Sequence, residues 1–387
     1  MRLLYARLQT GVKTPAYYQT IPLGFIIKMS KINVLTNNSC PNSKAFNCPL
    51  LASRPFFEEK GHRLDFHWKI SDKVHECDVL FINSNVFRTY WHDSKSYIFS
   101  FLEAAKSRKI KILWFDTTDS TWCTQFEVMP YVDLFLKSQI FKDRKTYLRR
   151  FRTGRIFTDY FDELYSSGEK EENFPLPLEK DLDKIRISWN TCFENYTESR
   201  FGITARIRQK ARPFLSSMLS QGLDIKFTPS NIKRSINTSC RLGLSHSRPS
   251  VLAHRKAVMK IMDKMGIQTS KICLPEYFSE LRNSQIGIGP FGVGEITLRD
   301  FEIIICGAAL VKPDMAHLET WPDFFQPDKT FISHKWDLSD MGEKIASALE
   351  DNDLRLHIAM EAQKIYRNAV LAEGLEKFAD RLIGLVK

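Results

Sequence analysis

A glycine-rich stretch offers the clearest chemistry in the sequence. It reads Gln285-Ile-Gly-Ile-Gly-Pro-Phe-Gly-Val-Gly-Glu295. Hydrophobic periodicity predicts a strand over residues 285–288 and a helix over residues 297–306, so most of the glycines fall on the loop between them. Glycines let a backbone approach a ligand closely, and the free N–H groups at a helix start attract anions. Such a loop could bind the diphosphate of a nucleotide.

The same glycines also satisfy the dinucleotide fingerprint GxGxxG, through Gly287, Gly289 and Gly292. Asp314 lies far enough downstream to bind a ribose, so an NAD-dependent oxidoreductase is an alternative. Two features weigh against it. Pro290 removes a backbone donor from the loop, and the fingerprint normally follows the first strand of its domain, whereas this one comes late.

The residues after the glycines are more specific. Residues 285–322 resemble the donor-binding region of GT-B glycosyltransferases of the bacterial group 1 kind. The runs that carry this resemblance are Pro290-Phe291-Gly292-x-Gly294-Glu295, Arg299-Asp300-Phe301-Glu302, Gly307, Lys312-Pro313-Asp314 and His317-Leu318-Glu319-Thr320. A fainter likeness covers Thr36-Asn37-Asn38-x-x-Pro41-Asn42-Ser43 and His254-Arg255. The resemblance implies a Leloir-type enzyme that transfers a sugar from a nucleotide-sugar donor.

The resemblance also implies roles for single residues. Glu302 would contact the ribose hydroxyls of the donor, and Glu295 would lie near the sugar or the phosphate. The predicted donor-binding residues are Gly292, Gly294, Glu295, Arg299, Glu302 and Lys312. The donor is a co-substrate, and neither a further cofactor nor a metal is expected, since no DxD-like acidic pair has a convincing setting and this fold usually needs no metal.

The spacing of the two glutamates departs from the family pattern. Retaining members of this fold place two glutamates eight positions apart, whereas Glu295 and Glu302 are seven apart. They still share a helix face, because two turns cover about 7.2 residues. The sequence therefore leaves open whether the anomeric configuration is inverted or retained. Asp300 is expected to cap the helix or pair with Arg299, and His317 and Glu319 to bind ligand or to shape a turn.

An inverting transfer needs a general base that deprotonates the acceptor hydroxyl. The predicted strand over residues 110–115 runs into Asp116-Thr-Thr-Asp119-Ser. Asp116 and Asp119 are therefore candidate catalytic residues, with Glu295 as a third. Turn and N-cap roles are the alternative for both aspartates. Asn37 and Asn38 follow another predicted strand, where they would bind a sugar or shape a turn.

Two basic clusters suggest an anionic partner, in line with the net charge of +11. Residues 142–155 carry seven basic residues and one acid, interleaved with Tyr147 and Phe151. They could bind donor phosphate, an anionic membrane surface or a single-stranded nucleic acid, or form a solvated face. No nucleic-acid-binding motif accompanies them, so that partner is not expected. A second cluster could neutralise the diphosphate leaving group and comprises Arg200, Arg206, Arg208, Lys210 and Arg212.

The elements that must position these residues alternate between strands and helices. In the first part, strands are predicted over residues 32–36, 63–67, 79–83, 110–115 and 132–136, with a helix over 94–109. Later come strands over 185–189, 224–228, 285–288 and 309–312, helices over 204–219, 249–265, 276–282 and 297–306, and two helices in the tail over 338–386. This order predicts an α/β protein of two doubly wound, Rossmann-like domains facing a cleft, with C-terminal helices crossing back.

The predicted domain organisation follows from composition shifts. Residues 29–165 form an N-terminal acceptor-side domain, and the acidic, proline-containing residues 166–184 form a linker. Residues 185–365 form the nucleotide-sugar-binding domain, and residues 366–387 a helix that packs toward the N-terminal domain. Residues 1–28 are excluded from the fold, as a disordered extension, a transit-peptide-like segment or the product of a start codon placed too far upstream.

Bulk composition fits a globular protein of more than one domain. The chain has 387 residues, of which 43% are hydrophobic and 26% charged. Its eight cysteines show no paired metal-ligand spacing, so a zinc site is not expected. We expect them to be buried free thiols in a reducing cytoplasm. No apolar run reaches the roughly 20 residues that span a bilayer. We therefore expect a cytoplasmic enzyme, with peripheral membrane contact through residues 142–155, acting on a glycan, lipid-linked or protein acceptor.

Overall fold

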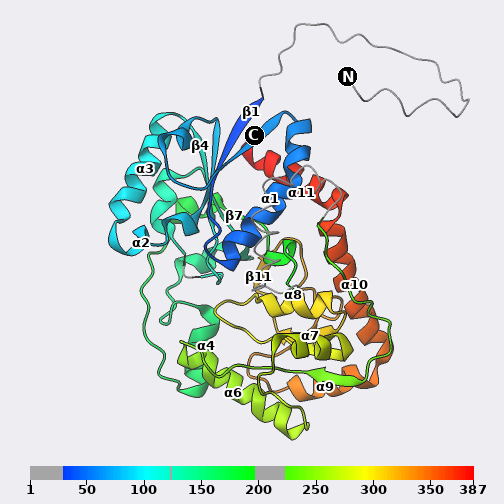
Figure 1. The fold of residues 1–387 in the computed structure, drawn as a ribbon. Helices are drawn as coiled ribbons and strands as arrows, with labels where there is room; N and C mark the ends of the chain where they lie inside the picture. The colour runs from blue at the N-terminus through cyan, green and yellow to red at the C-terminus, as the bar shows by residue number, and fades with distance from the viewer. Residues whose placement is uncertain (1–28, 123, 197–222) are drawn as a thin grey trace, which may run out of the picture.

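Two parallel β-sheets form the two halves of the molecule, one above the other in Figure 1. The computed structural model describes residues 29–122, 124–196 and 223–387. The upper sheet has the strand order β2-β1-β3-β4-β5-β7, and the lower sheet the order β12-β10-β9-β8. All neighbouring strands within these two sheets are parallel, so each sheet needs helical crossovers on its faces. The predicted α/β class with two doubly wound halves is confirmed.

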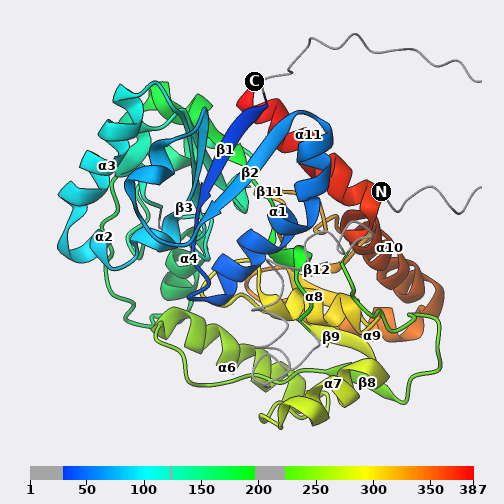
Figure 2. The same cartoon turned by 45° about the horizontal axis from the view of Figure 1, so that its top comes forward.

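The upper half is built from short apolar strands buried by helices. β3 (Val79–Asn83, VLFIN) is buried at every position, as expected of a parallel strand covered on both faces. Figures 1 and 2 show α3 on one side of this sheet and α1 with α11 on the other. The other bounds are β1 Ser30–Leu35, β2 His62–His67, β4 Lys111–Asp116, β5 Leu134–Lys137, β7 Ile185–Ile187, α1 Pro41–Glu59, α2 Tyr90–Asp93, α3 Lys95–Ser107 and α11 Ala372–Val386.

The lower half repeats this plan around a smaller sheet. Its helices α8 and α10 contact β10, and α9 contacts β9 and β12. The bounds are β8 Ile236–Ser239, β9 Ser284–Ile288, β10 Ala309–Pro313, β12 Ile332–His334, α4 Ile156–Tyr165, α6 Pro249–Lys264, α7 Leu274–Asn283, α8 Leu298–Ile305, α9 Met341–Glu350 and α10 Asn352–Val370. The tail thus holds three helices, where two were predicted.

One predicted strand is wrong, and a real strand was missed. Residues 224–228 have no regular secondary structure and join no sheet, because the segment is bonded to helices: the Leu223 amide donates to the Val370 carbonyl, and the Thr228 amide to the Ile305 carbonyl. The strand of this region is β8, with the sequence INTS, which pairs with β9. Its polar residues hid it from an argument based on hydrophobic pattern. The predicted helix over residues 204–219 lies outside the described residues, as do residues 1–28.

The predicted domain boundaries are wrong at two points. β7 was expected to open the second domain, but it pairs with β5 as the last strand of the first sheet. α4 was expected to close the first domain, but it packs on α6 and lies in the lower half of Figure 1. The chain therefore crosses between the halves more than once. The acidic residues of the predicted linker help to hold this crossing, since Glu169 and Glu172 both pair with Arg248.

Further contacts join the halves. β6 (Gln139–Phe141) from the first half pairs antiparallel with β11 (Leu318–Thr320) from the second. The last helix, α11, lies against α1, where Lys60 forms ion pairs with Glu376 and Asp380. The hydrophobic core is continuous across the junction, because one cluster of buried side chains includes residues of both sheets' helices. The two halves are therefore packed together, and not merely tethered.

Two histidines are buried in the lower half without charge. His254 on α6 is fully buried and stacks on Phe161 of α4 at 4.0 Å between ring centroids, and neither ring nitrogen has a hydrogen-bond partner in the ranges that the structure describes. Burial, and then the neighbouring His334 and Arg255, lower the pKa of His254 to about 3. Burial likewise lowers the pKa of His334 to about 4. Both side chains therefore stay neutral in the folded protein well below the pH at which they protonate in an unfolded chain.

This arrangement predicts acid-sensitive stability. Between pH 6.5 and these lowered pKa values the unfolded chain binds more protons, so stability falls as the pH falls. At pH 5 each histidine removes about 2 kcal/mol relative to pH 7. We expect His254→Leu to lose about 2 kcal/mol less than the wild type between these pH values, as measured by urea unfolding at each pH. Parallel pH dependences of the two proteins would contradict the assignment.

Candidate active site

A cleft of about 900 Å³ lies at the carboxyl ends of the first sheet's strands, where doubly wound sheets bind ligands. Most of its lining comes from the first half, from the loops that follow β1, β3, β4 and β5. The second half contributes its glycine-rich loop and the start of α8, through Val293, Gly294, Ile296, Thr297 and Leu298. The cleft therefore brings together the two segments from which the sequence predicted catalytic residues.

Asp116 lies at the end of β4, and both oxygens of its carboxylate already have protein partners. Its Oδ2 pairs with Lys137 Nζ at 3.0 Å, and its Oδ1 accepts a hydrogen bond from the Thr118 amide at 2.9 Å. Both members of the ion pair are buried, and Lys137 also donates to the Thr118 hydroxyl at 2.6 Å. This pair shapes the loop after β4. The geometry therefore favours Asp119 over Asp116 as a base.

Asp119 is exposed in the cleft at the other end of the same loop. Its Oδ1 accepts a hydrogen bond from Asn42 Nδ2 at 2.7 Å, and Asn42 also donates to the Thr117 carbonyl. Asn42 belongs to the first turn of α1, so the loops after β1 and β4 orient one another. Among the described residues no donor contacts the second carboxylate oxygen, which could accept a proton from a substrate hydroxyl.

The asparagines after β1 have structural roles. Asn37 donates to the Asn85 carbonyl at 3.0 Å, and the side chain of Asn38 accepts from Asn47 at 2.9 Å. Behind them, the Asn83 amide donates to the Thr36 hydroxyl and its carbonyl accepts from Thr117. These bonds join the ends of β1, β3 and β4 into one network. The alternative in which Asn37 and Asn38 shape turns therefore fits the structure better than direct sugar binding.

In the second half, α8 begins with a capping box. The Asp300 carboxylate accepts from the Thr297 amide at 2.8 Å, and its partner is Lys312 at 3.0 Å, not Arg299 as one alternative expected. Lys312 is fully buried and also donates to the Gly289 carbonyl at 3.2 Å. The structure therefore places Lys312, a predicted donor-binding residue, behind the loop, where it supports the loop and does not face the cleft.

Glu295 is also buried, although the sequence placed it beside the sugar or the phosphate. Its Oε2 accepts from the Thr121 amide at 3.1 Å and from Gln139 Nε2 at 3.0 Å, both in the other half of the molecule. Next to it, Gly294 packs on the Asp119 carbonyl so closely that an added Cβ would lie 1.8 Å from that oxygen. The glycine-rich loop thus makes direct contact with the loop of the candidate base.

A pair of arginines lies beside the glycine-rich loop. Arg299 on α8 has no hydrogen bond or ion pair among the described residues, and Arg255 on α6 donates only to the Gly243 carbonyl. Burial and then the charge of Arg299 lower the pKa of Arg255. A Cβ added to Gly292 would lie 3.9 Å from the Arg255 guanidinium. Two like charges next to a glycine loop form a site that an anion would stabilise.

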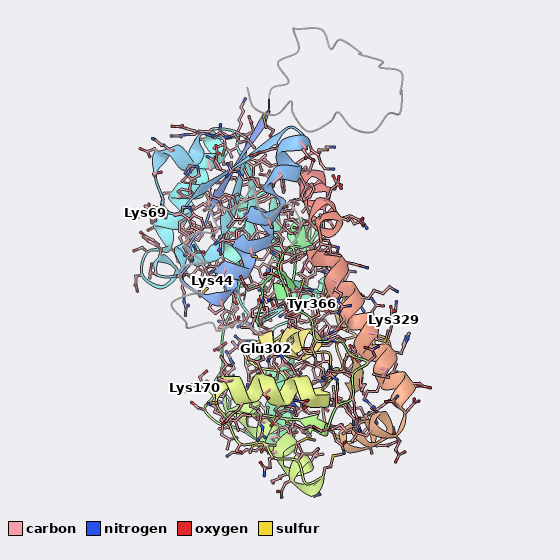
Figure 3. All side chains as sticks on the ribbon, turned by 45° about the vertical axis from the view of Figure 1, so that its right-hand side comes forward. Lys44, Lys69, Lys170, Glu302, Lys329 and Tyr366 are labelled. Carbon is pink, nitrogen blue, oxygen red and sulfur yellow. The ribbon has the colours of Figure 1, made fainter. Side chains whose placement is uncertain are left out.

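Glu302 lies three residues after Arg299, about one turn further along α8. It is 8% exposed, and its Oε2 accepts from the Tyr277 hydroxyl at 3.0 Å. Figure 3 shows Glu302 at the boundary between the two halves of the molecule. Burial and then the charge of Glu302 raise the pKa of Tyr277, so this phenol stays a donor. A carboxylate at this position, held by α7, is placed to accept hydrogen bonds from a ligand that lies over α8.

The basic segment over residues 142–155 is less exposed than its sequence suggests. Arg144 pairs with Glu319, Arg152 with Asp162, and Arg155 with Glu172. Four basic residues of the segment are exposed and have no ion pair within the described part of the chain: Lys142, Lys145, Arg149 and Arg150. Glu319 thus has a structural role at β11. The second basic cluster, over residues 200–212, lies outside the described residues.

Within residues 29–122, 124–196 and 223–387, no three His, Cys, Asp or Glu side chains gather as a metal site. None of the helices in these ranges combines the length and the apolar character that crossing a bilayer requires. Every cysteine placed there is a free thiol.

Several residues of the site were not predicted from sequence. Gln139 and Tyr277 carried no signal, because their roles depend on partners far away in the chain. Arg255 belongs to the pair His254-Arg255, whose likeness to the glycosyltransferase family is only faint. One usable signal was present for Lys137, since a lysine at the end of a buried strand needs a buried carboxylate partner.

Comparisons with known proteins bear on the second half. A protein-family model described as "Glycosyl transferase-like" matches residues 267–374, which contain the glycine-rich loop and α8. No curated protein matches the chain by sequence. This match favours glycosyl transfer over the NAD-dependent oxidoreductase and the nucleic-acid binder.

Among solved structures the similarities are distant. An alpha-glucosyltransferase in complex with UDP and DNA has a TM-score of 0.43 at 14% identity, over 92% of this chain and 99% of that one. Anabaena HepE in complex with UDP-glucose has a TM-score of 0.42 at 9% identity, over 92% and 100%. A glycosyltransferase from Rickettsia africae has a TM-score of 0.43 at 10% identity, over 92% and 98%. Likenesses this distant carry no argument about the site. Residues 267–374 form a glycosyl transferase-like domain, in agreement with the glycosyltransferase activity that the sequence predicted.

Proposed function

We propose that the enzyme binds the diphosphate of a nucleotide-sugar between its glycine-rich loop and the Arg255–Arg299 pair. The observation that carries this proposal is the pair itself, two arginines beside the glycine-rich loop that have no carboxylate partner among the described residues. Guanidinium groups bind phosphate oxygens through charge-assisted hydrogen bonds. Glu302 would accept hydrogen bonds from the ribose hydroxyls. We further propose that the donor is a co-substrate and that these arginines stabilise the leaving group without another cofactor.

An inverting transfer requires a general base, and we propose Asp119 for this role. The acceptor hydroxyl oxygen attacks the anomeric carbon and forms the new glycosidic bond. Its proton passes to the Asp119 carboxylate, which faces the cleft and is held by Asn42. The bond between the anomeric carbon and the diphosphate breaks, and its electron pair leaves with the nucleoside diphosphate. A retaining outcome would not need this base, so the product's configuration tests the assignment.

The acceptor side of the cleft suits a carbohydrate. Its lining carries many amide side chains, Asn42, Asn85, Gln125, Gln139, Asn173 and Asn190, together with hydroxyls. The aromatic rings of Trp91 and Phe174 add flat apolar faces, and Lys95 is neutralised by Glu127 at 2.8 Å. Neutral donors and acceptors with a few aromatic faces match the hydroxyls and C–H faces of a sugar. The acceptor sugar could belong to a glycan, a lipid-linked intermediate or a glycoprotein.

We also propose that the protein contacts an anionic membrane surface. The exposed side chains of Lys142, Lys145, Arg149 and Arg150 would supply it. Each basic residue near an anionic surface contributes about 1 kcal/mol, so four give weak, salt-dependent binding. Cosedimentation with anionic vesicles at low and high salt tests this point, and no binding at low salt would refute it.

The donor site can be tested by thermal shift with UDP, GDP, ADP, CMP and NAD⁺. A nucleotide at 100 times its Kd stabilises the folded protein by about 2.7 kcal/mol. We expect one nucleoside diphosphate to raise the Tm, and Arg299→Ala or Glu302→Ala to weaken its binding by about 10- to 100-fold, from the loss of a charged hydrogen bond. Arg108→Ala, an exposed arginine at the end of α3, is the matched control. Stabilisation by NAD⁺ alone, or an unchanged Kd in both variants, would refute the donor site.

A further inference from the structure

The contact between the glycine-rich loop and the Asp119 loop depends on one fully buried carboxylate. Glu295 Oε2 accepts from the Thr121 amide at 3.1 Å and from Gln139 Nε2 at 3.0 Å. Glu295 belongs to the second half of the molecule, and both donors belong to the first. The bonds therefore join the two sides of the cleft directly behind its wall.

Gln139 connects this carboxylate to the candidate base. The same amide nitrogen donates to the Asp119 carbonyl at 2.8 Å, so its two N–H groups link Asp119 and Glu295. The peptide of Thr121 is held on its other side by the Tyr147 hydroxyl, which donates to the Thr121 carbonyl at 3.3 Å. These bonds hold residues 119–121 from both sides.

Gly294, the residue before Glu295, places the glycine-rich loop directly against the loop of Asp119. Gly294 lies against the Asp119 carbonyl, and both line the cleft, whereas Glu295 does not. The bonds of Glu295 therefore set the position of the donor loop relative to the acceptor base. Glu295 Oε2 takes both of its donors from the opposite half of the molecule, whereas Oε1 is buried without a hydrogen-bond partner among the described residues.

We propose that Glu295 is a positioning residue, which aligns the donor loop with Asp119 through Thr121 and Gln139, and does not bind the donor. This inference rests on the proposed function, because it takes Asp119 as the base. Its role depends on hydrogen-bond acceptance and not on charge. A neutral glutamine has a carbonyl oxygen that can accept the same two bonds, whereas alanine has none.

The test compares Glu295→Ala, Glu295→Gln, Gln139→Ala and the Glu295→Ala/Gln139→Ala double variant. A displacement of about 1 Å at a reacting centre costs on the order of 100-fold in rate, so we expect that loss of kcat for Glu295→Ala with the donor Kd unchanged. Glu295→Gln should recover most of the rate. The double variant should lose little more than Glu295→Ala alone, since both substitutions remove one linkage. Glu103→Ala, an exposed helical glutamate of α3, is the matched control.

Hydrogen–deuterium exchange over residues 118–122 gives a readout that needs no catalysis. Exchange at the Thr121 amide should rise in Glu295→Ala and stay near wild type in Glu295→Gln. If Glu295→Gln loses donor affinity as fully as Glu295→Ala, Glu295 is a donor ligand and the inference is overturned. Unchanged exchange in Glu295→Ala overturns it as well. A wild-type chain that binds no nucleotide refutes the proposed function instead, and the exchange result still decides the role of Glu295.

Discussion

Asp119→Asn is expected to lower kcat for sugar transfer by about 100- to 10,000-fold, the range contributed by a general base. The side chain is exposed in the cleft and oriented by Asn42, so asparagine fits the same space and removes only the ability to take a proton. Donor affinity should not change, because the proposed donor site lies in the other half. Nucleoside diphosphate release and donor Kd, measured on the same preparation, give the two quantities.

Asp116→Asn is the informative comparison for this variant. Asp116 and Lys137 form an ion pair that is almost completely buried, and the substitution leaves the ammonium group without its charge partner. Loss of one member of a buried pair costs about 3–5 kcal/mol, so this variant should lose stability first and activity as a consequence. A folded Asp119→Asn variant with wild-type kcat would refute the assignment of the base.

The strands that position Asp119 could be predicted because parallel sheets have a simple sequence pattern. β3 and the core of β4 are continuous apolar runs, and a polar residue after such a run falls at the edge where ligands bind. The sequence therefore placed Asp116 and Asp119 at the cleft. It could not rank them, because the difference depends on Lys137, whose carboxylate partner is set by strand pairing between β4 and β5.

In the second half of the molecule, the sequence predicted the local elements but not the contacts between distant residues. The loop and helix around Gly294 and Glu302 follow from local periodicity and a family likeness, and the structure bears out both elements. The burial of Glu295 does not follow, because its donors Thr121 and Gln139 lie more than 150 residues earlier in the chain. β7 was assigned to the wrong sheet for the same reason, since the hydrophobic pattern of a strand does not reveal which strand it pairs with.

Gly294→Ala is expected to abolish most of the transfer activity through a purely steric effect. A Cβ at this position would lie 1.8 Å from the Asp119 carbonyl oxygen and 3.1 Å from the Ser120 nitrogen, both of them backbone atoms that cannot rotate away. The glycine loop and the Asp119 loop must then move apart. Because a displacement of about 1 Å at a reacting centre costs on the order of 100-fold in rate, we expect at least that loss of kcat.

The two halves of the site should respond differently to this variant. Arg255, Arg299 and Glu302 lie on helices of the second half and stay in place, so kcat should fall by a larger factor than the donor affinity. Gly384→Ala is the matched control, because no atom lies within 4 Å of its added Cβ and a helical alanine stabilises by about 0.4–1 kcal/mol. Donor titration, initial rates and small-angle scattering on both variants measure the effect. If Gly294→Ala keeps the wild-type kcat, the close contact between Gly294 and Asp119 is not the arrangement in which transfer occurs, and the base must reach the donor sugar from a more open cleft.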